Sequence, residues 1–134
     1  MTDTHRWDVL AAVAAGGALG SLARYGLGTL LPSPAGVATL IGNVAGCLAL
    51  GALMAVLTRR PDPPRLLRPF LGVGVLGGFT TFSTYVLDAL STVSDGRLVA
   101  GFAYAAGSVL ASLLAVVAGI AAVRFAAGRR QGAA

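Results

Sequence analysis

Apolar residues fill four long stretches of the chain, and short polar or proline-containing segments separate them. A bilayer core of about 30 Å is crossed by about 20 helical residues, and each stretch is at least that long. Proline and Asp-Gly end helices, so these separators mark the limits of the stretches. The pattern predicts an all-α integral membrane protein, one domain over residues 1–134, with four transmembrane helices at about residues 9–31, 35–57, 67–93 and 98–123. The separators are Pro32-Ser33-Pro34, a segment with Pro61, Pro63 and Pro64, and Ser94-Asp95-Gly96-Arg97.

The third stretch differs from the others because its middle is rich in glycine and hydroxyl groups. Residues 77–85 read Gly-Gly-Phe-Thr-Thr-Phe-Ser-Thr-Tyr. Glycine weakens a helix, and Ser and Thr side chains bond backbone groups that a helix has released. One interpretation is a gently kinked helix. The other, which we favour, is a helix broken near the bilayer midplane, whose free carbonyl oxygens can coordinate a cation such as Na⁺.

Pairs of glycines four residues apart recur in three of the stretches. Such small-xxx-small spacing lets helix backbones approach closely in a membrane. The pairs predict a tightly packed bundle, and they are Gly16/Gly20, Gly42/Gly46 and Gly74/Gly78.

The charged residues are few and unevenly placed. The 134 residues include ten arginines and five aspartates, with no lysine or glutamate, which gives a net charge of +5. The arginines flank apolar stretches, so they indicate membrane topology and no nucleic-acid partner. A single cysteine, Cys47, excludes an internal disulfide and a cysteine-based metal site.

Arginine placement also predicts the orientation in the membrane. Four spans put both termini and the second connection on one side. The opposite side holds only Arg97, together with Arg24 if its side chain reaches outward. Positively charged loops stay in the cytoplasm, so we expect a multi-pass protein of the cell membrane with both termini cytoplasmic. The arginines on that side are Arg6, Arg59, Arg60, Arg65, Arg68, Arg124, Arg129 and Arg130.

The chain is not expected to be an enzyme. Its only histidine, His5, lies in the N-terminal tail, and no Ser-His, Cys-His or paired-carboxylate set falls within the spans. Asp88 is the one carboxylate inside a predicted span. A proton relay and a structural ion pair with Arg24 are both open for it, and the ion pair is favoured.

Several other polar side chains in the spans are candidates for an ion path or for contacts between helices. Arg24 either faces a vestibule, where it would attract anions, or extends to the headgroups. Asn43 either lines a pore or bonds a neighbouring helix. The fourth stretch carries one stripe of hydroxyl groups, at Tyr104, Ser108 and Ser112. Neutral donors of this kind suit a small, strongly hydrated anion, whose lost water they can replace.

Three motifs resemble those of the Fluc/CrcB fluoride channel family. The four-span layout that accompanies them covers nearly the whole chain. They are Gly16-Gly17-Ala18-Leu19-Gly20-Ser21-Leu22-Ala23-Arg24-Tyr25, Thr39-Leu40-Ile41-Gly42-Asn43-Val44-Ala45-Gly46 and the segment 77–85.

The resemblance implies subunits paired as an antiparallel dimer, with two pores that carry F⁻ passively out of the cell. It also implies a structural Na⁺ at the dimer centre, bound by the backbone carbonyls of Gly77 and Thr80, and a vestibule at Arg24. The side chains that it places along the pores are Asn43, Phe82, Ser83, Thr84 and Tyr85, with Tyr104, Ser108 and Ser112 beside them.

Two features depart from the family pattern. Tyr85 stands where the family usually has a second phenylalanine, and its hydroxyl is expected to slow or retune conduction. An antiparallel homodimer needs nearly balanced arginines, which this chain lacks, so an oppositely oriented paralogous subunit is the expected partner and a homodimer the alternative. The alternative functions are a small four-span proton-coupled drug exporter, which requires an in-membrane glutamate that this chain lacks, and a non-conducting assembly protein.

Overall fold

The computed structural model describes residues 3–31 and 36–131, with side chains from Arg6 to Leu31 and from Gly36 to Arg129. All regular elements in these residues are helical, and they form four helical segments long and apolar enough to cross a membrane. The prediction of four helices capable of spanning a membrane is therefore confirmed. The connection Pro32-Ser33-Pro34 lies outside the described residues. The elements are α1 (Asp3–Leu30), α2 (Val37–Leu57), the π-helical η1 (Arg68–Leu76), α3 (Gly77–Phe79), α4 (Ser83–Ser94) and α5 (Leu98–Gln131).

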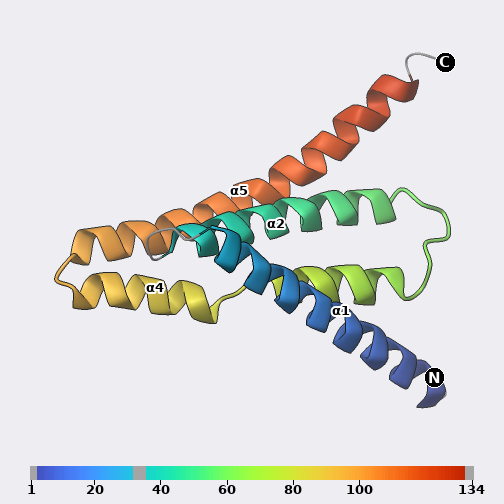
Figure 1. The fold of residues 1–134 in the computed structure, drawn as a ribbon. Helices are drawn as coiled ribbons and strands as arrows, with labels where there is room; N and C mark the ends of the chain where they lie inside the picture. Colours follow the sequence, from blue (N-terminus) through green and yellow to red (C-terminus); the bar gives the residue numbers. More distant parts are fainter. Residues whose placement is uncertain (1–2, 32–35, 132–134) are drawn as a thin grey trace.

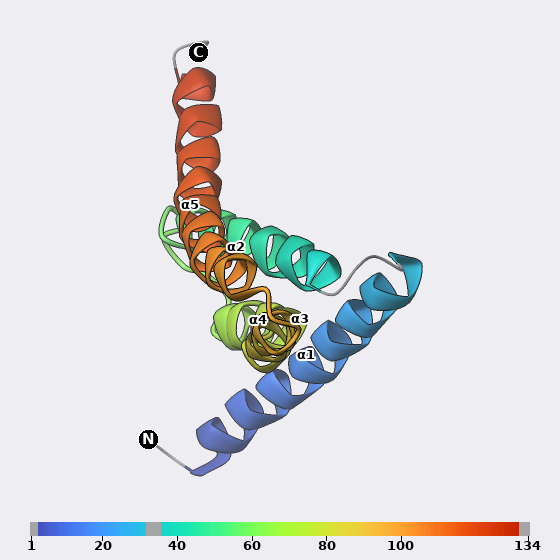
Figure 2. The same cartoon turned by 90° about the vertical axis from the view of Figure 1, so that its left-hand side faces the viewer.

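The helices form two packed groups (Figures 1 and 2). In one group α1 lies against η1 and α3, and in the other α2 and α4 pack on α5. Figure 2 shows α1 and α2 diverging from each other, and contacts between α2 and η1 join the two groups. The start of α1 and the end of α5 lie at the same end of the bundle as the α2–η1 connection (Figure 1).

Glycines make the contact between α1 and the third span. A methyl group added at Gly16 would collide with the carbonyl oxygen of Phe70, and one at Gly20 with that of Val75. On the facing side, Gly74 and Gly78 leave no room for a methyl group against the α1 backbone. The close approach predicted from these two glycine pairs is confirmed, since each pair packs against the backbone of the helix that carries the other pair.

A second glycine contact joins α2 to α5, and the sequence pattern did not predict it. A methyl group at Gly51 would collide with the carbonyl oxygen of Val116, and one at Gly119 with that of Leu48. A methyl group added at either glycine of the predicted pair Gly42/Gly46 would meet only side chains within 4 Å. The backbone approach of α2 therefore lies further along the helix than the pattern indicated.

The fourth helix is longer than predicted. The sequence suggested a polar tail after Val123, whereas α5 continues to Gln131, because alanine, arginine and glutamine favour helix and no proline interrupts them. A helix of 34 residues is about 51 Å long, against a bilayer core of about 30 Å. Its C-terminal part extends beyond the other helices (Figure 1).

Candidate functional site

The third span changes backbone conformation in the middle of the 77–85 motif. Helical geometry ends at Phe79, Thr80 is extended with φ −79° and ψ 155°, and α4 begins at Ser83. In a continuous α-helix the amide of Thr81 would donate to the carbonyl of Gly77, but here it donates to Oδ1 of Asn43 at 2.8 Å. The amide of Thr84 likewise donates to Oγ1 of Thr81 at 3.3 Å rather than to a backbone carbonyl.

Asn43 on α2 bonds both polar groups of the Thr81 backbone. Its Nδ2 donates to the carbonyl oxygen of Thr81 at 2.9 Å, while its Oδ1 accepts from the Thr81 amide. A buried backbone group without a partner is costly, so the side-chain amide replaces the hydrogen bonds that the extended segment has lost.

Two hollows of about 280 Å³ each adjoin this contact. Both open on the surface of the chain, and Asn43 and Thr81 line both of them. The first hollow is further lined by Cys47, Phe82, Tyr85, Ser108 and Ser112, and the second by Arg24, Tyr25, Thr39 and Thr84, among others.

The structure thus brings together most of the side chains singled out in the sequence, but it separates two of them. Ser83 and Tyr104 line neither hollow. The Ser83 hydroxyl lies 3.3 Å from that of Thr81. The Tyr104 hydroxyl donates to the carbonyl oxygen of Gly36 at 3.1 Å and lies 3.5 Å from Oδ2 of Asp88. The hydroxyl stripe of α5 is therefore divided between the first hollow and a contact with the start of α2.

Ser108 has a hydroxyl without a partner. The residue is only 5% exposed, it lines the first hollow, and its Oγ has no hydrogen bond within the described part of the chain. Because a buried hydroxyl prefers to be bonded, this one is a donor available to a ligand in the hollow.

The aromatic residues of this region form a row. The ring centroids of Phe82 and Tyr85 are 5.6 Å apart, and those of Tyr85 and Tyr104 are 6.1 Å apart. The Tyr85 hydroxyl donates to the carbonyl oxygen of Ala105 at 3.1 Å, which fixes the ring to α5. Phe82 is 77% exposed on the surface of the single chain.

The predicted ion pair between Arg24 and Asp88 is wrong for this chain. Within the described residues Asp88 has Tyr104 as its side-chain partner, and Arg24 lines the second hollow. The two cannot meet because α1 packs on η1 and α3 and makes no contact with α4. The ion pair that does form joins Arg65 of the α2–η1 connection to Asp8 of α1, at 2.8 Å.

Cys47 and Thr81 are among the lining residues that were not assigned to a site from the sequence. Cys47, expected to be a packing residue, lies one turn after Asn43 and lines the first hollow. Thr81 was counted only among the hydroxyl groups of its segment. The four-residue spacing from Asn43 could have indicated Cys47, whereas the position of Thr81 depends on the course of the extended backbone.

Comparison with known proteins identifies the relatives of this chain. The family model described as CrcB-like protein, Camphor Resistance (CrcB), matches residues 11–120. The chain belongs to the CrcB family. Membership and four apolar helices together make it a multi-pass membrane protein.

Curated CrcB relatives are similar over most of their length. A protein of Nocardia farcinica named fluoride-specific ion channel FluC 2 is 48% identical over 90% of this chain and 88% of its own. A protein of the same name from Thermobifida fusca is 52% identical over 84% of this chain and 85% of its own. Fluoride-specific ion channel FluC 1 of Streptomyces coelicolor is 50% identical over 81% and 72%. These names describe ion channels and no enzyme.

Proposed function

We propose that this protein is a fluoride-specific ion channel, which lets F⁻ leave the cell passively across the cytoplasmic membrane. The observation that carries the proposal is the 48% identity to a FluC channel over 90% of the chain. The hollows beside Asn43 support it, since they offer neutral hydrogen-bond donors together with a single arginine.

The first hollow has the chemistry that a dehydrated fluoride ion needs. Fluoride holds its water strongly, so a path through the membrane must replace that water with other donors. The unpaired hydroxyl of Ser108 is such a donor, and Ser112 lies one turn further along α5. The ring edges of Phe82 and Tyr85 carry partial positive charge and add weaker contacts.

The second hollow would serve as the vestibule. Arg24 lines it and has no ion pair among the described residues. A fixed positive charge at the mouth of a pore raises the local concentration of anions. Thr84 and Asn43 lie in the same hollow and would take over the ion from the vestibule.

The change of conformation at Thr80 is proposed to be a functional break in the third transmembrane helix, which holds a structural Na⁺. Carbonyl oxygens are suitable ligands for an alkali cation. In a continuous helix, the carbonyls of Gly77 and Thr80 would accept hydrogen bonds from the amides of Thr81 and Thr84. Those two amides bond to side chains instead. Both carbonyls thereby lose those helical hydrogen bonds and fit the proposed site. Bound Na⁺ would supply a fixed positive charge that holds the two breaks of a dimer together.

A second subunit is proposed to cover the open sides of the hollows, in antiparallel orientation. Phe82, Ser83 and Thr84 are exposed on the single chain. The hydroxyls of Ser83 and Thr84 bond to the Thr81 hydroxyl in the single chain, but in lipid their remaining hydrogen-bonding capacity would find no partner, which is unfavourable. A subunit packed on this face would shield them and complete two pores.

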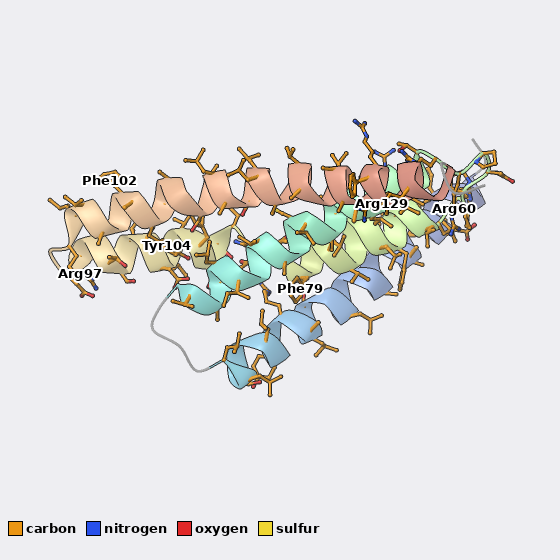
Figure 3. The ribbon with its side chains drawn as sticks, turned by 90° about the horizontal axis from the view of Figure 1, so that it is seen from above. Arg60, Phe79, Arg97, Phe102, Tyr104 and Arg129 are labelled. Atoms are coloured by element: carbon orange, nitrogen blue, oxygen red, sulfur yellow. The ribbon has the colours of Figure 1, made fainter. Side chains whose placement is uncertain are left out.

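The partner is proposed to be a paralogous chain of opposite orientation, with this chain inserted with both termini in the cytoplasm. Arg60 and Arg129 lie at one end of the helices and Arg97 at the other (Figure 3). So uneven a distribution favours one orientation for this chain. If cysteine or epitope tags at the termini report both orientations of this chain expressed alone, the protein is a homodimer instead.

Fluoride efflux from liposomes tests the function. Purified protein is tested alone and with each candidate partner. The complete dimer is expected to release F⁻ down its gradient but not Cl⁻, and a proton uncoupler is expected to leave the rate unchanged. Uncoupler-sensitive flux would indicate a proton-coupled exporter. Absence of F⁻ flux with every partner would refute the proposal.

A further inference from the structure

We propose that Thr81 is a conduction residue, whose hydroxyl contacts F⁻ as the ion passes between the two hollows, and that Asn43 is the positioning residue that holds it there. This inference rests on the proposed channel function. It assigns a role to a side chain that motif comparison left without one.

The position of Thr81 is the first argument. Of all the residues that line the two hollows, only Asn43 and Thr81 line both. Together they form the wall between the side of Arg24 and the side of Ser108. An ion that moves from one hollow to the other passes this wall.

The second argument is that Asn43 has most of its hydrogen-bonding capacity engaged. Its Oδ1 and one N–H group hold the amide and the carbonyl of Thr81, at 2.8 and 2.9 Å. A side-chain amide has only one further N–H group to offer a passing ion. Its main effect is therefore to fix the backbone of Thr81, and with it the direction of the Thr81 side chain.

The third argument is the hydroxyl cluster that Thr81 forms. Its Oγ1 donates to Oγ1 of Thr84 at 3.1 Å and lies 3.3 Å from Oγ of Ser83. A hydroxyl rotates freely about its C–O bond and carries one donor. The three groups can thus bond one another when no ion is near and turn their donors to an anion when it arrives, so that no polar group in the wall is left unpaired.

Thr81 also accepts the amide of Thr84 at 3.3 Å, which is a capping contact for α4. A purely structural cap is therefore the competing explanation. Ser, Asn and Asp all cap helices at least as well as Thr, but only Asp adds a negative charge. The substitutions Thr81→Asn and Thr81→Asp consequently keep the cap and differ in their effect on an anion.

The experiment measures initial F⁻ efflux per folded channel in liposomes, assembled with whichever partner gives wild-type flux. Thr81→Asp is expected to lower the rate by at least about tenfold relative to Thr81→Asn, because a negative charge at the wall repels F⁻. Lowering the pH from about 8 to about 5.5 should restore much of the Thr81→Asp rate and leave that of Thr81→Asn nearly constant, since a carboxyl in an apolar setting takes up a proton readily. Protein-free liposomes measure the leak of HF. Ser94→Asp, at the exposed end of α4 and outside both hollows, is the control for an added charge.

Equal rates for Thr81→Asp and Thr81→Asn at all pH values would show that Thr81 is only a cap and would overturn the inference. If Thr81→Asp does not fold, Thr81→Val and Thr81→Ser decide: flux per channel should fall at least about tenfold for Val and less than about threefold for Ser, on the scale of a lost donor to an ion. Wild-type flux in folded Thr81→Val would equally overturn it. Failure of the channel proposal is distinct, because then the wild-type protein itself carries no F⁻.

Discussion

The contact between α2 and α5 and the contact between Asn43 and Thr81 hold parts of the same bundle by opposite means. The first brings two backbones together where Gly51 and Gly119 have no side chains. The second fills the space between α2 and the third span with a polar side chain whose two ends bond one peptide backbone. Lipid chains are as apolar as leucine, so burial alone does not drive helices together in a membrane. Close packing and hydrogen bonds must do so, and this chain uses each in a different place.

The difference predicts how each region responds to mutation. The glycine contact cannot accept one more carbon atom, because the facing groups are backbone and cannot rotate away. The polar contact can accept a change of shape but cannot lose hydrogen-bonding groups. The sharpest tests are therefore substitutions that add a carbon atom at the glycine contact or remove hydrogen-bonding groups from the polar contact.

The largest effect is expected for Gly119→Ala. The added methyl group would collide with the carbonyl oxygen of Leu48 and force α2 away from α5. We expect the free energy of unfolding to fall by about 3 kcal/mol or more, which is the upper range for an overpacked core. The yield of monodisperse protein should fall as well. Gly107→Ala on the same helix is the control, since nothing lies within 4 Å of its new methyl group. Equal thermal unfolding midpoints in detergent for both variants would show that the contact is not as tight as described.

A somewhat smaller effect is expected for Asn43→Ala. The substitution leaves the amide and carbonyl of Thr81 without side-chain partners, which should lower the free energy of unfolding by about 1–3 kcal/mol in total. Cys47→Ala removes a similar volume from the same hollow without removing a hydrogen bond found in the structure, and about 1 kcal/mol or less is expected for it. Thermal unfolding of the two variants in the same detergent compares them. A loss no greater for Asn43→Ala than for Cys47→Ala would contradict the proposed function of the side-chain amide.

Tyr85→Phe should slightly lower the stability of the protein and raise its rate of F⁻ efflux. It removes the hydrogen bond to the carbonyl of Ala105, at about 1 kcal/mol. It also restores a ring without a hydroxyl, so we expect faster F⁻ efflux from liposomes. Tyr25→Phe is the control for stability, because Tyr25 is 73% exposed and the described residues give its hydroxyl no partner. Slower efflux in Tyr85→Phe would show that the phenol hydroxyl assists conduction.

The smallest effect is expected at the ion pair of Arg65 and Asp8. Their side chains are 48% and 54% exposed, and exposed pairs stabilise proteins by about 1 kcal/mol or less. Asp8→Asn should change the unfolding midpoint only slightly, and less still at high salt. A change as large as that of Asn43→Ala would mean that this exposed pair stabilises the bundle as much as the polar contact between Asn43 and Thr81 does.

Local features of this chain could be predicted from its sequence better than the contacts between its helices. The four spans followed from apolar length and from Pro61, Pro63 and Pro64, which act within one segment. Hydropathy could not reveal that Gly51 meets the α5 backbone, because a glycine does not specify its neighbour. The predicted ion pair of Asp88 with Arg24 was wrong because a charge does not specify its neighbour either. Arg24 has the opposite charge, but the packing of α1 puts it out of reach.

The site shows the same limit. The residue types of the hollows were recognisable, since Asn43, Ser108 and Ser112 are unusual in an apolar span. The double hydrogen bond of Asn43 to Thr81 was not, because it depends on the extended backbone at Thr80. Tyr104 shares a helix face with the two serines, yet its longer side chain reaches Gly36 instead.

The long last helix has a practical consequence for those who study this protein. Since α5 continues as an unbroken helix to Gln131, another helical protein could be fused to it in phase, with no flexible joint between the two. Such a rigid graft would add mass and recognisable shape to an assembly whose subunit is only 13.3 kDa, which is too small for electron microscopy to align by itself. The angle of the graft to the bundle could then be chosen, residue by residue, in steps of about 100° of helix rotation.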